Sequence, residues 1–105
     1  MASPQLSHGY IKISTELFKE IYYRITNPTH LRLVLFVIRF TYGYQRKEFD
    51  TNLTSIGKTV RLSTEYCREM IIDLSDKCRV IKAHWKSSHI VTLSLVKDYD
   101  KWHLE

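Results

Sequence analysis

The chain has 105 residues, enough for one domain with a single hydrophobic core and too few for two. Its 44% hydrophobic and 26% charged residues are typical of a folded soluble domain and exclude a disordered chain. The longest apolar run, Leu33 to Ile38, is too short to span a membrane, two cysteines exclude a disulfide scaffold, and the net charge of +5 favours an anionic partner.

Two helices are predicted in the first half of the chain. Ser14 is a candidate N-cap for a helix over 15–24, in which apolar residues recur at spacings of three and four. A second helix is predicted from near Thr29 to about Tyr42; it is apolar on nearly every side and is expected at the centre of the core. Gly43 is expected to end it by adopting a positive φ.

The second half of the chain predicts two short helices followed by a β-hairpin. Residues 47–52 are expected to be extended or turn-like. Helical periodicity is found over 54–60 and 63–77, and Thr54 and Ser63 are the capping residues ahead of these patterns. The period then changes to two over 80–85 and 90–95, which predicts two strands joined by a basic tip.

This order of elements is that of a winged helix-turn-helix, an α+β fold that is mostly α. It has a three-helix core, here with an extra N-terminal helix, and a C-terminal β-hairpin as the wing. The domain is expected over 9–97. Residues 1–8 are expected to be a disordered remnant of cloning, and 98–105 a tail of a chain that has been shortened.

The fold assigns the candidate binding residues. The helix after the turn enters the major groove, and its polar face carries the candidate base contacts Thr64, Glu65, Tyr66 and Arg68. Arginine can donate to guanine and glutamate can accept from cytosine. The candidate phosphate contacts are Arg46, Lys47, Thr54, Lys58, Arg61, Ser63, Lys82 and Lys86.

The positive charge is unevenly distributed. Residues 21–47 contain five basic and no acidic residues, 79–97 contain four basic and none acidic, and the middle stretch 48–77 has a net charge of −2. The predicted reading helix lies in that middle stretch. We therefore expect DNA affinity to come from the flanks, with limited base specificity from the helix.

The sequence also resembles the N-terminal, origin-binding domain of phage replication protein O over residues 9–95. The resemblance is carried by Gly9 to Ile13, by Val37 to Lys47 with Asp50 after it, and by Leu53 to Ile56 followed by Leu62-Ser63. The chain departs from the pattern at Gly57, Arg61, Thr64 and Glu65. The resemblance implies a winged-helix replication initiator whose origin can lie within its own gene and whose further C-terminal region recruits helicase-loading proteins.

No catalytic, metal or cofactor site is predicted. The five histidines lack the spacing of zinc ligands, and the chain has neither a glycine-rich phosphate loop nor a nucleophile elbow. Cys67 and Cys78 are expected to be buried thiols, and Trp85 is a candidate for stacking on a base. The chain is therefore expected to be a binding protein and not an enzyme.

The sequence predicts double-stranded DNA binding at a replication origin of a phage or mobile element. Two alternatives stay open: a winged-helix transcriptional regulator, and a protein-docking winged helix used in primosome or oligomer assembly. Expected partners are DNA, a second copy on repeated sites, and helicase-loading proteins bound through a region outside this chain. The expected location is the cytoplasm of the bacterial host, at the nucleoid, with no membrane partner.

Overall fold

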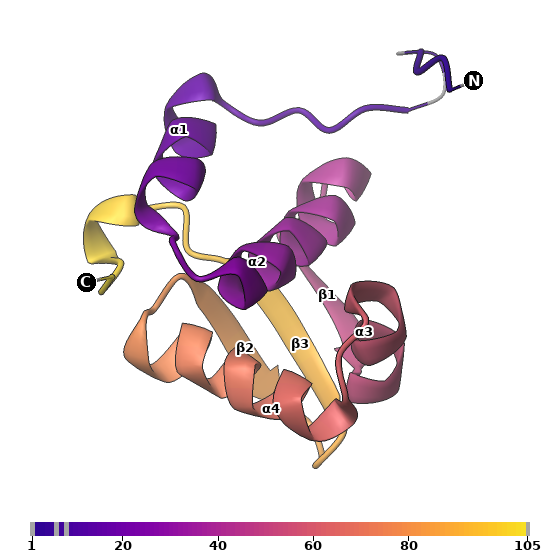
Figure 1. Cartoon of the computed structure of the whole chain (residues 1–105), viewed down its shortest axis with the longest axis vertical. Helices are drawn as coiled ribbons and strands as arrows, with labels where there is room; N and C mark the ends of the chain where they lie inside the picture. Colours follow the sequence, from indigo (N-terminus) through magenta and orange to yellow (C-terminus); the bar gives the residue numbers. More distant parts are fainter. Residues whose placement is uncertain (1, 6, 8, 105) are drawn as a thin grey trace.

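The computed structural model describes residues 2–5, 7 and 9–104, which form four α-helices and a three-stranded antiparallel sheet (Figure 1). The α-helices are α1 (Thr15–Arg24), α2 (Pro28–Thr41), α3 (Leu53–Val60) and α4 (Thr64–Ile72), and the strands are β1 (Glu48–Asn52), β2 (Ile81–Trp85) and β3 (Ile90–Leu95). Short turns of helix are η2 (Tyr42–Tyr44), the π-helical η3 (Asp73–Lys77) and η4 (Tyr99–Lys101). The order α2, β1, α3, α4, β2, β3 is consistent with the predicted winged helix.

Side-chain caps define where the helices begin. The Oγ of Ser14 accepts a hydrogen bond from the Leu17 amide at 3.1 Å, so the predicted cap of α1 is confirmed. The predicted cap Thr54 is wrong. Asn52 caps α3 instead, because its Oδ1 accepts from the Ser55 amide at 2.8 Å, and the helix begins one residue earlier than expected.

The end of α2 corrects the prediction for Gly43. The helix ends at Thr41 and tightens into η2, which contains Gly43 without a positive φ. The left-handed residue is Gln45, with φ 54°, and its amide donates to the Tyr42 carbonyl at 3.2 Å. A 3₁₀ turn delays the reversal of the chain by two residues beyond the glycine.

The stretch predicted as extended or turn-like forms the edge strand β1. The strand order is β1-β3-β2, so β3 lies in the middle and pairs antiparallel with both neighbours. Glu48 is opposite Ser94 at one end of the β1–β3 ladder, and Asn52 is opposite Ile90 at the other, beside the hairpin tip. The wing is therefore continuous with a three-stranded sheet.

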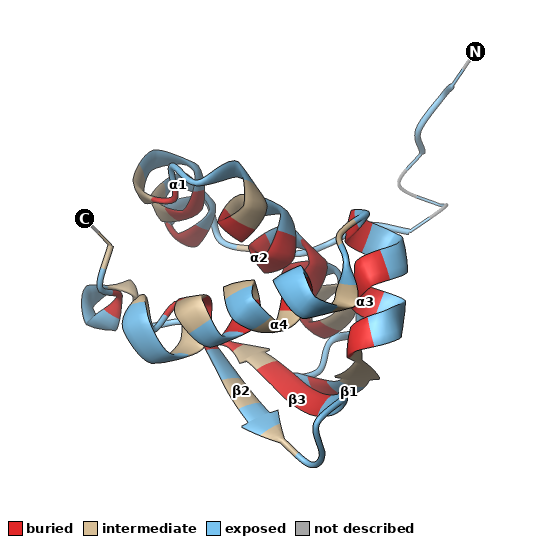
Figure 2. Cartoon of the chain, turned by 60° about the horizontal axis from the view of Figure 1, so that its bottom comes forward, coloured by how far each residue is buried: buried red, intermediate tan, exposed pale blue. Residues whose placement is uncertain are grey.

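The helices cover one face of this sheet and leave the other face open (Figures 1 and 2). Phe49, Ile81 and Leu93 point toward the helices and are buried, whereas Asp50, Lys82 and His84 are exposed. This alternation follows from the period of two in a strand. The core also includes one face of each α-helix, with Ile21, Val34, Ile56 and Ile71 almost fully buried. No described helix is long and apolar enough to cross a bilayer.

The C-terminal segment 98–104, which was expected to be a tail, packs against the rest of the fold. Trp102 is 4% exposed, and its indole N–H donates to the Val96 carbonyl at 2.8 Å. The Arg24 guanidinium stacks on its ring at 5.4 Å and donates to the Tyr99 carbonyl at 2.7 Å. The Tyr99 hydroxyl donates to Glu16, which raises the pKa of Tyr99 to about 12. Within the expected cloning remnant, residues 1, 6 and 8 lie outside the described part, as does 105.

Candidate nucleic-acid interface

The turn between α3 and α4 is built on a close approach of two backbone segments. The Leu62 amide donates to the Gly57 carbonyl at 2.9 Å, and a Cβ at Gly57 would lie 2.7 Å from the Leu62 carbonyl oxygen. Arg61 ends α3 in the left-handed region with φ 60°. Gly57 and Arg61, at which the sequence departs from the pattern it resembles, both fit this turn: Gly57 leaves room for the Leu62 carbonyl, and Arg61 adopts the left-handed conformation that ends α3.

The N-terminal end of α4 presents a polar surface. Cys67 and Ile71 are buried, while Glu65 and Tyr66 are exposed and Thr64 is half-buried. The Oγ of Ser63 accepts from the Tyr66 amide at 3.2 Å, which confirms its capping role and occupies one of its lone pairs. The predicted base contacts Thr64, Glu65 and Tyr66 are therefore together on the first turn of the helix.

Arg68 connects α4 to the wing. Its Nη2 donates to the Ser88 carbonyl at the hairpin tip, and its guanidinium stands 5.8 Å from the centre of the Trp85 ring. The side chain is half-buried. Arg68 thus holds the helix and the hairpin tip as one surface, and Trp85 is packed beneath it as a cation–π partner.

The tip of the wing is less cationic than its sequence suggests. The Nζ of Lys86 lies 2.9 Å from Oδ2 of Asp50, and Oδ1 of Asp50 accepts from the Thr92 hydroxyl at 2.6 Å. These contacts, the Thr92 hydrogen bond first, lower the pKa of Asp50 below its usual value. The amide of Leu53 donates to the His89 carbonyl at 3.0 Å, so the tip is also tied to the start of α3.

The outer face of the sheet carries Lys82. It is opposite Ser94 on the face that the helices leave open, next to Lys97 and Lys101 and to the acidic Glu48 and Asp98. The structure therefore does not place Lys82 with the surface of α4. Sequence spacing predicts that Lys82 and Lys86 share a strand face, but it does not reveal which side of the sheet that face takes.

Arg46 belongs to a cluster of arginines and aromatic rings at the turn before β1. Its guanidinium lies 4.9 Å from the Tyr44 ring and 5.5 Å from the Phe49 ring, and its Nε donates to the Phe40 carbonyl at 2.7 Å. Arg39 stacks on the same Tyr44 ring at 5.2 Å. The side chain of Arg46 is thus held in place, and Tyr44, which is 53% exposed, is flanked by two guanidinium groups.

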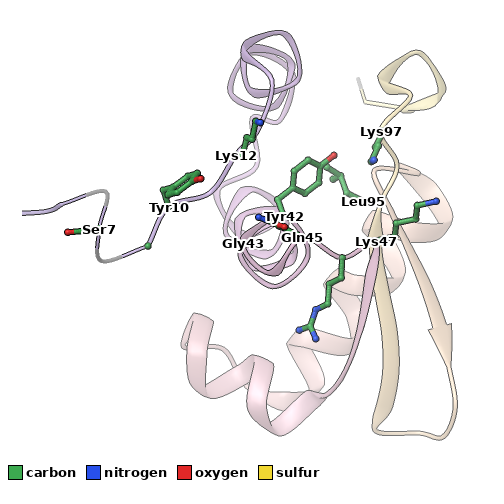
Figure 3. A pocket seen from close by; sticks show the side chains of 11 residues that line it. Ser7, Tyr10, Lys12, Tyr42, Gly43, Gln45, Lys47, Leu95 and Lys97 are labelled. Carbon is green, nitrogen blue, oxygen red and sulfur yellow. The ribbon is translucent and has the colours of Figure 1, made fainter.

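A basic cleft of about 680 Å³ adjoins this turn (Figure 3). In that view the side chains of Lys12 and Lys97 lie on either side of the Tyr42 ring, while Lys47 points away from it, and Lys97 Nζ is 5.8 Å from that ring. Burial raises the pKa of Tyr42. Among the described residues that line the cleft none is acidic. Sequence reasoning missed Lys12 and Lys97 as site residues because the segments that carry them meet only in the folded chain.

The predicted phosphate contacts therefore lie at several places and not on one surface. Arg46 and Lys47 are at the end of the sheet where Glu48 pairs with Ser94, and the wing tip is at the opposite end, about 14 Å away along β1. Thr54, Lys58 and Arg61 are exposed on α3 or its C-terminal cap, and Ser63 caps α4, whereas Lys82 is on the open face of the sheet and Lys86 pairs with Asp50. The residues of α3 and its C-terminal cap adjoin the start of α4, which carries the predicted base contacts.

Comparison with known proteins gives one family. The sequence pattern described as Bacteriophage replication protein O matches residues 3–102, nearly the whole chain and every element described above. No curated protein and no solved structure matched the chain. Given the extent of the match, the chain belongs to the bacteriophage replication protein O family.

Proposed function

We propose that this domain binds double-stranded DNA at a phage replication origin, with α4 in the major groove and the β2–β3 hairpin along the phosphate backbone. The carrying observation is that Arg68 docks the wing tip against α4, so that the polar first turn of the helix and the hairpin form one surface. The replication role of the family supports an origin over a regulatory site.

The parts of this surface have different roles in the proposal. Lys58 and Arg61 on α3 and the free amides at the start of α4 contact phosphates, and Thr64, Glu65 and Tyr66 reach base edges. Arg68 acts first as a positioning residue for the wing. Arg46 and Lys47, with the basic cleft, contact a more distant part of the backbone.

The domain acts by binding alone and carries out no catalytic step. Its setting is the cytoplasm of the bacterial host, at the nucleoid. A second copy on repeated sites and helicase-loading proteins, recruited by a region outside this chain, complete the proposed assembly.

The proposal is tested by fluorescence anisotropy with duplexes tiling the protein's own gene and with random duplex, each over a range of salt concentrations. We expect a preferred duplex and a log–log slope of affinity against salt of about −4 to −5, as for about five phosphate contacts. A weak affinity with almost no salt slope would instead favour the protein-docking alternative, for which the pairing of Lys86 with Asp50 is the supporting observation.

Charge-removing variants locate the surface. Lys58→Ala and Arg61→Gly should each weaken binding to all duplexes and reduce the magnitude of the slope by about 1. Glycine suits the left-handed φ of residue 61, so this variant removes a charge without straining the turn. Lys19→Ala, on the exposed side of α1, is the matched control and should leave both quantities unchanged. Equal effects of all three variants would place the DNA elsewhere.

A further inference from the structure

Three side chains with metal-binding chemistry meet on the side of the molecule away from the wing tip. His30 is in the first turn of α2, Asp73 begins η3, and Cys78 follows η3. One ligand atom from each of them lies within 4.8 Å of the other two. Imidazole nitrogen, carboxylate oxygen and thiolate sulfur are the donor types that zinc binds in proteins.

The π-helical turn brings two of these donors together. The Cys78 amide donates to the Asp73 carbonyl at 3.0 Å, an i to i+5 hydrogen bond. In an α-helix, residues five apart point to different sides, whereas the wider π turn places them over each other. π turns of this kind are frequent at functional sites.

The imidazole of His30 supplies a second, independent observation. Its side chain is 9% exposed, and Nε2 is a buried polar atom with no aligned hydrogen bond among the described residues. The atom lies 2.8 Å from Oδ2 of Asp73, within ion-pair distance, although the two groups are not aligned as a hydrogen bond. A buried nitrogen without an aligned hydrogen bond would be stabilised by a ligand on its lone pair.

The cluster lies in an open depression of about 620 Å³, formed with the C-terminal segment. His103 also lines this depression, and its amide donates to the Cys78 carbonyl at 2.7 Å. The Lys77 ammonium is 3.7 Å from Oδ1 of Asp73, but its side chain is 83% exposed and can move into water. An ion can therefore enter from solvent and find Oδ2, the oxygen that faces His30.

We propose that His30 Nε2, Asp73 Oδ2 and Cys78 Sγ bind a zinc ion, with the His103 imidazole or water as the fourth ligand. Tetrahedral zinc keeps its ligand atoms about 3.3–3.8 Å apart, so the His30–Asp73 contact lengthens slightly and Cys78 moves inward. The thiol proton is released to solvent on binding. The ion would join α2, the end of α4 and the C-terminal segment, and so stabilise the fold independently of DNA binding.

Cobalt(II) titration of the untagged, reduced domain tests the site. We expect one equivalent to produce a near-ultraviolet thiolate-to-cobalt charge-transfer band with the visible bands of tetrahedral cobalt, and one equivalent of zinc to abolish them. Excess zinc should raise Tm by about 5 °C or more. A folded domain that shows no charge-transfer band overturns the proposal.

Variants assign the ligands. Cys78→Ser should abolish the charge-transfer band, and Asp73→Asn should weaken zinc binding about tenfold or more, each with an unchanged circular dichroism spectrum. Two control variants should leave the band intact. They are Cys67→Ala, which alters a thiol on the buried side of α4, and His84→Gln, which alters an exposed imidazole on β2. If His103→Gln weakens zinc binding, His103 is the fourth ligand; if zinc binding is unchanged, the fourth ligand is water. A band that survives Cys78→Ser refutes the site.

Discussion

Gly57 shows how one residue permits the helix-turn-helix. Its missing side chain leaves room for the Leu62 carbonyl oxygen, which would lie 2.7 Å from a Cβ. That oxygen belongs to the backbone of a hydrogen-bonded turn, so moving it would disturb the turn. At Gly43, by contrast, the nearest neighbour of an added Cβ would be the flexible end of the Arg39 side chain, 3.3 Å away. The turn therefore requires glycine at position 57, whereas position 43 can accept a small side chain.

Gly57→Ala should destabilise the domain by about 1 kcal/mol or more in urea denaturation, because overpacking against backbone outweighs the better helix propensity of alanine. Gly43→Ala is the matched control and should change the free energy of unfolding by about 0.5 kcal/mol or less, because its φ is not positive and Arg39 can shift. Equal stabilities for the two variants would show that the turn is looser than described.

Among the secondary-structure elements, the wing is held by contacts from outside its own strands. Arg68 reaches it from α4, Leu53 donates to its tip from the start of α3, and Asp50 on β1 binds Lys86. A two-stranded hairpin is marginal in water without such support. The orientation of the wing relative to α4 therefore depends on these few side-chain and backbone contacts.

Arg68→Ala should loosen the wing without unfolding the domain. It removes the hydrogen bond to the Ser88 carbonyl and the stacking on Trp85, so we expect amide hydrogen exchange at 86–90 to accelerate severalfold while exchange in α2 is unchanged. Nuclear magnetic resonance of the exchanging amides measures this. Lys82→Ala, on the open face of the same hairpin, should leave exchange at the tip as it is. Unchanged exchange in Arg68→Ala would mean that the sheet alone orients the wing.

Across the molecule as a whole, the C-terminal segment closes the core over α1. Trp102 of that segment is buried and stacks against Arg24 of α1, and the hydrogen bond from Tyr99 to Glu16 joins the same two parts of the chain. Local pattern could not predict this, because a lone tryptophan among polar residues has no period. The family match extends to residue 102 and so includes the segment as far as Trp102.

Trp102→Ala should lower the free energy of unfolding by about 3–5 kcal/mol, a large share of the stability of a domain this size. The loss comes from buried aromatic surface, the indole hydrogen bond and the arginine stacking. Tyr23→Ala, which alters an aromatic side chain that is 73% exposed, is the control and should cost about 0.5 kcal/mol or less in the same urea titration. A small loss for Trp102→Ala would show that the segment is dispensable.

Much of the fold could be predicted from local pattern. The spacing of Leu17 and Ile21 in α1, the Ser63 cap of α4 and the alternation in β2 each report on burial or capping within one element. One error arose because two nearby polar residues can both cap a helix, and Asn52 caps α3 where Thr54 was predicted. Another arose because a 3₁₀ turn follows α2, so the positive φ is at Gln45 and not at Gly43. These are choices between nearly equal local energies.

The sequence could predict which elements and residues form the candidate site, but not how they are arranged in space. The order of elements, the residues of α4 and the resemblance to the replication protein O family could all be read from the sequence, because periodicity and capping are local. The folded chain was needed to show that Arg68 and Lys86 are engaged within the protein, that Lys82 is on the open sheet face, and that His30, Asp73 and Cys78 meet. Such partners depend on sheet register and on how helices pack across the core, and no local pattern encodes those distances.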